Sequence, residues 1–295
     1  MKTLLRKVFE ALLTLFGRLH CRRLKMCLVH LRYVSASLSL PAAANFARAV
    51  GVELAYGLLD RICRRRSCPV CGWTGWEYSP VFLNDNYRPA TRCPECLTYE
   101  RHRLLHRRLT ALRGEDVSPR ALFVGPNIRF TRSLFKEHAF TIDIYPHNHA
   151  DVLGDLVDLP FANRSFDIVV CFRVLEHVGD DAAALEGLRR ILTPSGRLFL
   201  SVPLYEGLPH TYDYSRDRMA CPRGPTWCYP NHRRDYAAED LERRIRTAGM
   251  EVERIVPDRN SPEETRVKTC PDHDTTGRRL GLTYIDIVFE CRPAS

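Results

Sequence analysis

Residues 165–202 read SFDIVVCFRVLEHVGDDAAALEGLRRILTPSGRLFLSV. The two ends of this stretch, 166–171 and 197–202, are continuous apolar runs of the kind that form strands buried on both faces. Between them, apolar residues recur at helical spacing after Asp180 and Asp181, which are typical of a helix start. A strand, a helix and a second strand in this order predict a parallel α/β unit.

The same alternation continues on both sides of this unit. Further strands are predicted at 121–124, 140–144 and 284–289, and a turn is predicted at 193–196. We therefore expect an α/β domain over residues 113–295, with a parallel sheet covered on both faces. Residues 204–234 form a long, irregular segment between a predicted strand and the next helix, and segments of this kind often carry functional residues.

Four of the twelve cysteines form two Cys-x-x-Cys pairs, separated by 21 residues: Cys68, Cys71, Cys93 and Cys96. Each pair folds into a knuckle that points both sulfurs at one centre, and two knuckles supply the four thiolates that suit zinc. Such a site has no open position, so its Zn²⁺ is structural. We expect a zinc ribbon and a linking helix at 67–112, the helix covering 100–112.

The first 66 residues have a charge balance of +10, so the net charge of +9 belongs wholly to them. They contain 13 Lys/Arg against 3 Asp/Glu, whereas the rest of the chain has 31 against 32. Apolar stripes at 5–19 and a second stretch at 42–62 predict a basic helical extension. Two interpretations stay open: a helical pair that packs on the body, and a peripheral membrane anchor.

The composition gives no reason to place the chain outside the cell or within a membrane. Apolar residues make up 45% and charged residues 27%, and no apolar run has the length of a transmembrane helix. The N-terminus has no clean signal-peptide pattern, so we expect a cytoplasmic protein. The near-neutral remainder of the chain argues against a broad nucleic-acid surface.

Four segments follow one another in a recognisable order: GDLVDLPF (154–161), SFDIVV (165–170), VLEHV (174–178) and LTPSGRL (192–198). In these segments the chain resembles the class I S-adenosylmethionine (SAM)-dependent methyltransferases of the type 11 group. With the cysteine pairs and ERHR (100–103), it is similar to a bacterial subgroup of zinc-ribbon methyltransferases. The resemblance covers residues 67–295 and implies methyl transfer from SAM to a small or conjugated metabolite. It also implies a Rossmann-like domain with a mixed seven-stranded sheet over residues 113–295, and a substrate lid at 204–234.

The resemblance also implies a cofactor site. Asp143, eighteen residues after Gly125, matches the acidic residue that takes the ribose hydroxyls, with Ile144 beside it. Asp155 matches the residue that accepts the adenine amino group, with Leu156 beside it. A turn or helix N-cap is the alternative role for Asp143.

The first loop departs from the family's glycine-rich pattern. It reads Gly125-Pro126-Asn127, with one glycine and a proline that has no N–H to offer. Arg173, just after the strand at 166–171, is the candidate partner of the cofactor carboxylate, and a plain surface arginine is its alternative. If this loop no longer holds the cofactor, the chain would be a non-enzymatic scaffold with a decayed site.

Methyl transfer to oxygen, the acceptor atom that we expect, needs alignment and a base. The candidates for the base are His177 and His232, one after a predicted strand and one inside the predicted lid. An RNA methyltransferase with an N-terminal zinc finger is the rival enzyme class, and strong salt-dependent RNA binding would distinguish it.

Overall fold

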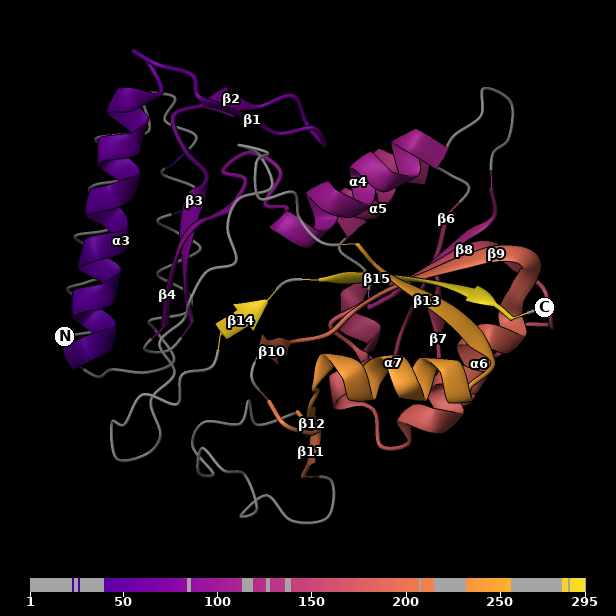
Figure 1. Ribbon diagram of the computed structural model, residues 1–295. Helices are drawn as coiled ribbons and strands as arrows, with labels where there is room; N and C mark the ends of the chain where they lie inside the picture. The colour runs from indigo at the N-terminus through magenta and orange to yellow at the C-terminus, as the bar shows by residue number, and fades with distance from the viewer. Residues whose placement is uncertain are drawn as a thin grey trace. The chain divides into compact units, whose positions relative to one another are not determined.

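The computed structural model describes residues 23, 26, 40–83, 86–112, 119–125, 128–135, 139–206, 208–214, 232–255, 283–285 and 287–294. The chain forms two compact units, Met1–Arg103 and Leu104–Ser295 (Figure 1). The stripe at 5–19 lies outside the described residues. The finer division at residues 66 and 112 stays a prediction.

The first unit combines one long helix with short antiparallel strands. Helix α3 has Pro41 in its first turn, where a missing N–H costs nothing, and covers most of the predicted 42–62 stretch. Strand β1 pairs with β2, and β3 pairs with β4. The bounds are α3 Leu40–Leu59, β1 Arg66–Ser67, β2 Thr74–Gly75, β3 Ser79–Leu83 and β4 Asn86–Arg92.

The second unit contains a seven-stranded sheet in the order β13-β15-β9-β8-β5-β6-β7. Strands β9, β8, β5, β6 and β7 run parallel, and β15 is antiparallel to both of its neighbours. This is the mixed seven-stranded sheet that was predicted. The bounds are β5 Ala121–Val124, β6 Ala139–Asp143, β7 Val152–Leu153, β8 Phe166–Phe172, β9 Leu192–Ser201, β13 Met250–Ile255 and β15 Val288–Pro293.

Helices cover both faces of this sheet because its strands are apolar on both faces. Phe123 of β5 packs edge-on against Phe130 and Phe135, 6.4 and 5.8 Å between ring centroids. Its neighbours Leu122 and Val124 point the other way, into the core shared with α6 and α7. The helices are α4 Glu100–Leu112, α5 Ile128–Phe135, α6 Asp181–Ile191, α7 Ala238–Thr247 and the 3₁₀ turns η2 Pro146–Asn148 and η3 Leu175–His177.

Two predicted boundaries differ from the structure. Strand β9 begins at Leu192 instead of 197, and the predicted turn at 193–196 lies within it, at a register shift. The strand predicted at 284–289 is in fact two strands in different sheets. β15 joins the main sheet, whereas β14 (Thr283–Ile285) pairs with β10 (Leu204–Glu206), because a continuous apolar run does not show where a chain changes partners.

Within the residues that the structure describes, no helix combines the length and the hydropathy that crossing a membrane requires.

Candidate functional site

The carboxyl ends of β5, β6 and β7 bring together the residues that were expected to hold the cofactor. Gly125 follows β5, Asp143 is the last residue of β6, and Gly154 follows β7. The Gly125 N–H donates to the Ile142 carbonyl (3.0 Å), and the Gly154 N–H donates to the Asp143 carbonyl (3.1 Å). The chain passes from β7 back to β8 on the other side of β5, and such a switch point is where open α/β sheets bind ligands.

Asp143 is the last residue of β6, at the carboxyl end of the strand. Its Oδ1 accepts from the Tyr145 N–H (2.9 Å) and its Oδ2 from the Asn148 side-chain amide (2.8 Å). These are the bonds of a turn-forming aspartate, and they also hold the carboxylate at the strand end. Ile144, the next residue, is 56% exposed. Ribose binding by Asp143 stays a prediction.

Asp155 lies on an exposed turn directly after Gly154. Its Oδ1 accepts from the Val157 N–H (3.1 Å), which fixes the carboxylate near the turn backbone. The adjacent Leu156 is 4% exposed and belongs to the main core. The buried Leu156 side chain therefore anchors the turn, and the exposed Asp155 carboxylate lies at the carboxyl edge of the sheet.

Two features of the Gly125 position favour glycine. Its φ is +62°, in the left-handed region, and an added Cβ would lie 2.6 Å from Cγ2 of Val174. The backbone after β5 therefore approaches the segment after β8 closely. Pro126 and Asn127, the other two residues of the predicted cofactor loop, lie outside the described residues.

Arg173 is held in the left-handed region directly after β8. Its φ is +62°, and its N–H donates to the Ser201 carbonyl at the end of β9 (2.8 Å). For a residue with a Cβ this conformation costs about 1–2 kcal/mol, and such strain concentrates at functional sites. The predicted contact with the cofactor carboxylate stays a prediction.

The fold brings together His177 and His232, which are 55 residues apart in the sequence. Their ring centroids lie 4.8 Å apart at an interplanar angle of 78°. Burial, and then electrostatic repulsion from the neighbouring His177 and Arg173, lower the pKa of His232 to about 3, so this imidazole is neutral at pH 7. Glu176, next to His177, is 1% exposed.

Hydrogen bonds from the two residues after His232 hold this histidine pair in place. The Arg233 N–H donates to the Glu176 carbonyl (2.7 Å) and its Nε to the His177 carbonyl (3.1 Å). Arg234 donates to the carbonyls of Val178 and Gly179, both at 2.7 Å. These bonds fix the start of β12 (Arg234–Asp235), which pairs with β11 (Tyr212–Asp213), against the segment after η3.

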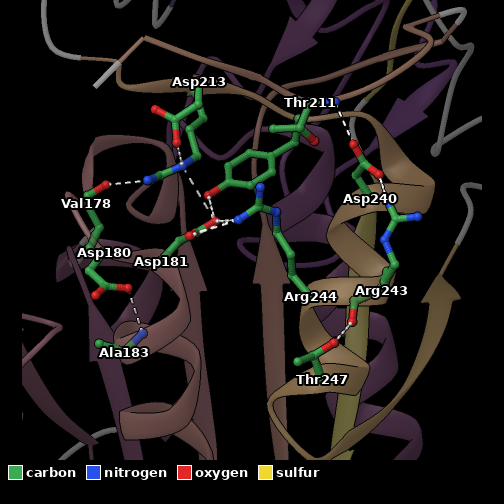
Figure 2. A network of polar contacts seen from close by, with 12 residues as sticks. Val178, Asp180, Asp181, Ala183, Thr211, Asp213, Asp240, Arg243, Arg244 and Thr247 are labelled. Atoms are coloured by element: carbon green, nitrogen blue, oxygen red, sulfur yellow. Dashed lines mark hydrogen bonds and ion pairs between the residues drawn. The ribbon is translucent and has the colours of Figure 1, made fainter. Parts of the chain in front are cut away.

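A buried aspartate organises the polar network beside this segment (Figure 2). Asp181 is 3% exposed and accepts from the Tyr236 hydroxyl (2.9 Å) and from Arg244 (3.0 and 3.1 Å). Arg234 lies 3.7 Å from it and donates to Asp213 of β11 at 2.8 Å. The network therefore joins α6, α7, β11 and β12.

The first unit holds a second candidate site, which is made of the four predicted cysteines. Their sulfurs all lie within 4.8 Å of one another, with Cys68–Cys96 and Cys71–Cys93 both at 3.7 Å. Four thiolates around zinc at Zn–S of ~2.3 Å would lie about 3.8 Å apart, whereas a disulfide requires about 2.05 Å. The spacing thus suits a metal rather than a disulfide.

The two knuckles have the same backbone pattern. Gly72 N–H donates to the Cys68 carbonyl (2.9 Å), and Leu97 N–H donates to the Cys93 carbonyl (3.0 Å). Both Gly72 (φ +71°) and Leu97 (φ +64°) are left-handed, so a leucine occupies in one knuckle the place that glycine takes in the other. The shared geometry explains why both pairs face one centre.

Comparison with known proteins finds a family match for the first part of the second unit. The family model described as "Methyltransferase domain" matches residues 103–200, which begin at the boundary of the second unit and include β5 to β8 and most of β9. Residues 103–200 therefore match a methyltransferase domain. In this methyltransferase domain, Gly125, Asp143 and Asp155 lie at adjacent strand ends of the seven-stranded sheet.

Curated relatives resemble only part of the chain. A "Probable S-adenosylmethionine-dependent methyltransferase" of Mycolicibacterium smegmatis is 35% identical over 100 residues, 34% of this chain and 34% of its own. A ubiquinone/menaquinone biosynthesis C-methyltransferase of Psychromonas ingrahamii is 37% identical over 70 residues, 23% and 28% of the two chains. The matched segments span between 17% and 48% of the length of the curated relatives.

Among solved structures, the Burkholderia thailandensis 1,6-didemethyltoxoflavin-N1-methyltransferase superposes with a TM-score of 0.41 at 14% identity. That superposition covers 66% of this chain and 77% of the other.

Sequence reasoning did not single out two residues of the methyltransferase domain. Glu176 was part of the VLEHV motif and received no role, although a carboxylate buried next to a histidine is an unusual pairing. Asp181 was expected only to begin a helix. In the structure Asp180 is the N-cap, accepting from the Ala183 N–H (3.0 Å), and Asp181 is the buried centre of the network.

Proposed function

We propose that this protein transfers a methyl group from SAM to a small or conjugated metabolite, at an oxygen atom. One observation carries the proposal: Gly125, Asp143 and Asp155 lie at three neighbouring strand ends of a class I methyltransferase sheet, beside its switch point. The acceptor class and the oxygen atom come from the family resemblance and from the two histidines at this edge.

The residues present fit the cofactor. The close approach of Gly125 to Val174 leaves room for backbone and none for a side chain, as a loop that lies against a nucleotide requires. Asp143 and Asp155 offer carboxylates to the ribose hydroxyls and the adenine amino group. Bound SAM would supply an electrophilic methyl group, and Arg173 would neutralise its carboxylate.

Calorimetry on the full chain tests this proposal. We expect SAM and S-adenosylhomocysteine to bind, and adenosine to bind more weakly because it lacks the amino-acid end. If none of the three ligands binds at millimolar concentration, the scaffold with a decayed site replaces the enzyme. If binding is seen but the chain also binds RNA with a steep salt dependence, the RNA methyltransferase becomes the better assignment.

We propose that the four cysteines hold one structural Zn²⁺. The support is the sulfur geometry together with the donor set, since four thiolates at these separations match tetrahedral coordination. Thiolate ligands must stay reduced, and the four cysteines form no disulfide with one another. This chemistry fits a reducing compartment, and it supports the cytoplasm as the location.

We propose, from charge alone, that residues 1–66 give the protein a peripheral contact with anionic membranes. Thirteen basic residues against three acidic ones would attract such a surface. Co-sedimentation of the full chain with anionic vesicles, lost at high salt and absent with neutral vesicles, is the expected result. Equal behaviour with both vesicle types would leave packing on the body as the role of this segment.

A further inference from the structure

Glu176, His177 and His232 form a second compact set of ligand atoms. One carboxylate oxygen and one nitrogen from each imidazole all lie within 4.8 Å of one another. Among the described residues, this set and the four cysteines are the two groups with such geometry. All three residues belong to the methyltransferase domain, at the end of η3 and at the start of the segment that leads into β12.

Hydrogen bonds to backbone carbonyls hold the three residues of this set together. Arg233 bonds to the carbonyls of both Glu176 and His177, and Arg234 bonds to the two carbonyls that follow. His232 is therefore held beside η3 by its two successors. The Glu176 side chain is 1% exposed, so its carboxylate is held inside the fold next to the two imidazoles.

Two imidazoles and one carboxylate are a ligand set of catalytic zinc sites, which keep a fourth position open. The set also lies near the expected methyl donor. Val174, two residues before Glu176, is the side chain that an added Cβ on Gly125 would strike at 2.6 Å. An open position here would face the same carboxyl edge of the sheet as the proposed cofactor site.

We propose that Glu176, His177 and His232 bind one divalent transition-metal ion, zinc or a metal of similar preference, with an open position for the acceptor oxygen. The role of that open position rests on the proposed function. The metal would lower the pKa of the acceptor hydroxyl, whose proton passes to water. The oxygen then forms the new C–O bond while the methyl–sulfur bond breaks and the sulfonium becomes a neutral thioether.

This assignment changes the role of the two histidines. An imidazole nitrogen that ligates a metal cannot also accept a proton, so the metal would replace the free histidine base expected from the sequence. This set offers three ligand atoms, whereas the ribbon offers four thiolates. We therefore expect this site to bind metal less tightly than the four thiolates of the ribbon.

Cobalt(II) titration of the metal-free full chain distinguishes the two sites. Thiolate ligation gives intense sulfur-to-cobalt absorption in the near ultraviolet, whereas nitrogen and oxygen ligands give only weaker visible bands. We expect a first equivalent with the sulfur bands, and a second with visible bands alone. Glu176→Gln, His177→Ala and His232→Ala should each lose the second equivalent and keep the first. The control variant His210→Ala should keep both cobalt equivalents, because His210 lies outside the set.

Retention of the sulfur bands and of the wild-type circular dichroism spectrum shows that a variant is folded. The proposal is overturned if the wild type never takes up the second equivalent, or if that equivalent persists in all three variants. Because cobalt uptake is measured without SAM, a failure of the methyltransferase proposal would leave this result unaffected. A chelator that abolishes methyl transfer while the ribbon keeps its metal would tie the site to the reaction.

Discussion

At the scale of single residues, two aspartates at opposite ends of parallel strands have different tasks. Asp143 ends β6 at the carboxyl edge, whereas Asp167 is the second residue of β8, at the other edge. The Asp167 carboxylate accepts from the Arg120 N–H (3.0 Å) and from the Thr193 hydroxyl (3.2 Å), so it joins three segments of the sheet. This geometry agrees with the structural role expected for it.

We predict that Asp143→Ala weakens SAM binding roughly ten- to hundredfold, because hydrogen bonds to a charged acceptor contribute on the order of 1.5–3 kcal/mol. The matched control Asp167→Ala should lower the free energy of unfolding and leave SAM affinity nearly unchanged. Calorimetry and denaturant unfolding of both variants measure the two effects. Equal losses of affinity in both variants would contradict the assignment of Asp143.

Gly125 gives a second prediction at this scale. Gly125→Ala should reduce both stability and SAM affinity, because the new Cβ meets Val174 and the left-handed backbone costs about 1–2 kcal/mol. The double variant Gly125→Ala/Val174→Ala should recover part of the stability, since the clash is gone and the backbone cost remains. No recovery in chemical unfolding would show that the contact with Val174 does not matter.

At the scale of elements, one buried carboxylate links α4 to two strands of the sheet. Glu290 of β15 is 1% exposed at its side chain and accepts from Arg108 of α4 (2.6 Å), Arg292 (2.8 Å) and Arg197 of β9. Burial acts to raise the pKa of Glu290, but the hydrogen bonds from Arg108, Arg292 and Arg197 outweigh it and lower the pKa.

We predict that Glu290→Gln lowers the free energy of unfolding by on the order of 1–3 kcal/mol at pH 7, because three guanidinium groups lose their shared anion. The folded pKa lies below the unfolded value of about 4.3, so the contribution is complete above that value. It disappears as the pH falls through the lowered folded pKa. Urea unfolding of wild type and variant from pH 7 to pH 3 should show the difference shrinking only below about pH 4.

At the scale of the whole molecule, the two compact units should respond to different ligands. Zinc sites contribute folding free energy to small units directly, whereas SAM stabilises the domain that binds it by mass action. We predict that Cys68→Ser or Cys96→Ser lowers the stability of the first unit and abolishes about one equivalent of zinc. Metal analysis and calorimetric scans of the full chain check this result.

Saturating SAM should raise the midpoint temperature of the second unit's unfolding transition, and not that of the first unit. At one hundred times the dissociation constant it adds about 2.7 kcal/mol, or roughly 5–10 °C in the midpoint of a domain of this size. A zinc-free variant should keep this SAM-dependent shift. A single transition that both ligands move together would contradict independent units.

The sequence by itself determined the parts of this protein that depend on local pattern. The helices at 100–112 and after Asp180, the strand at 121–124 and the paired cysteines follow from residue spacing, because periodicity and knuckle geometry act over a few residues. The same pattern did not predict the buried positions of Glu176 and Asp181. In the sequence, Glu176 is only part of a motif, and Asp181 only marks the start of a helix.

The tertiary structure decided which distant residues meet. It placed His232 against Glu176 and His177, made Asp181 the partner of Arg244, and split one apolar run between two sheets. No local pattern specifies these contacts, because they form only when α6, α7 and the strands close on a common core and every buried polar group must then find a partner.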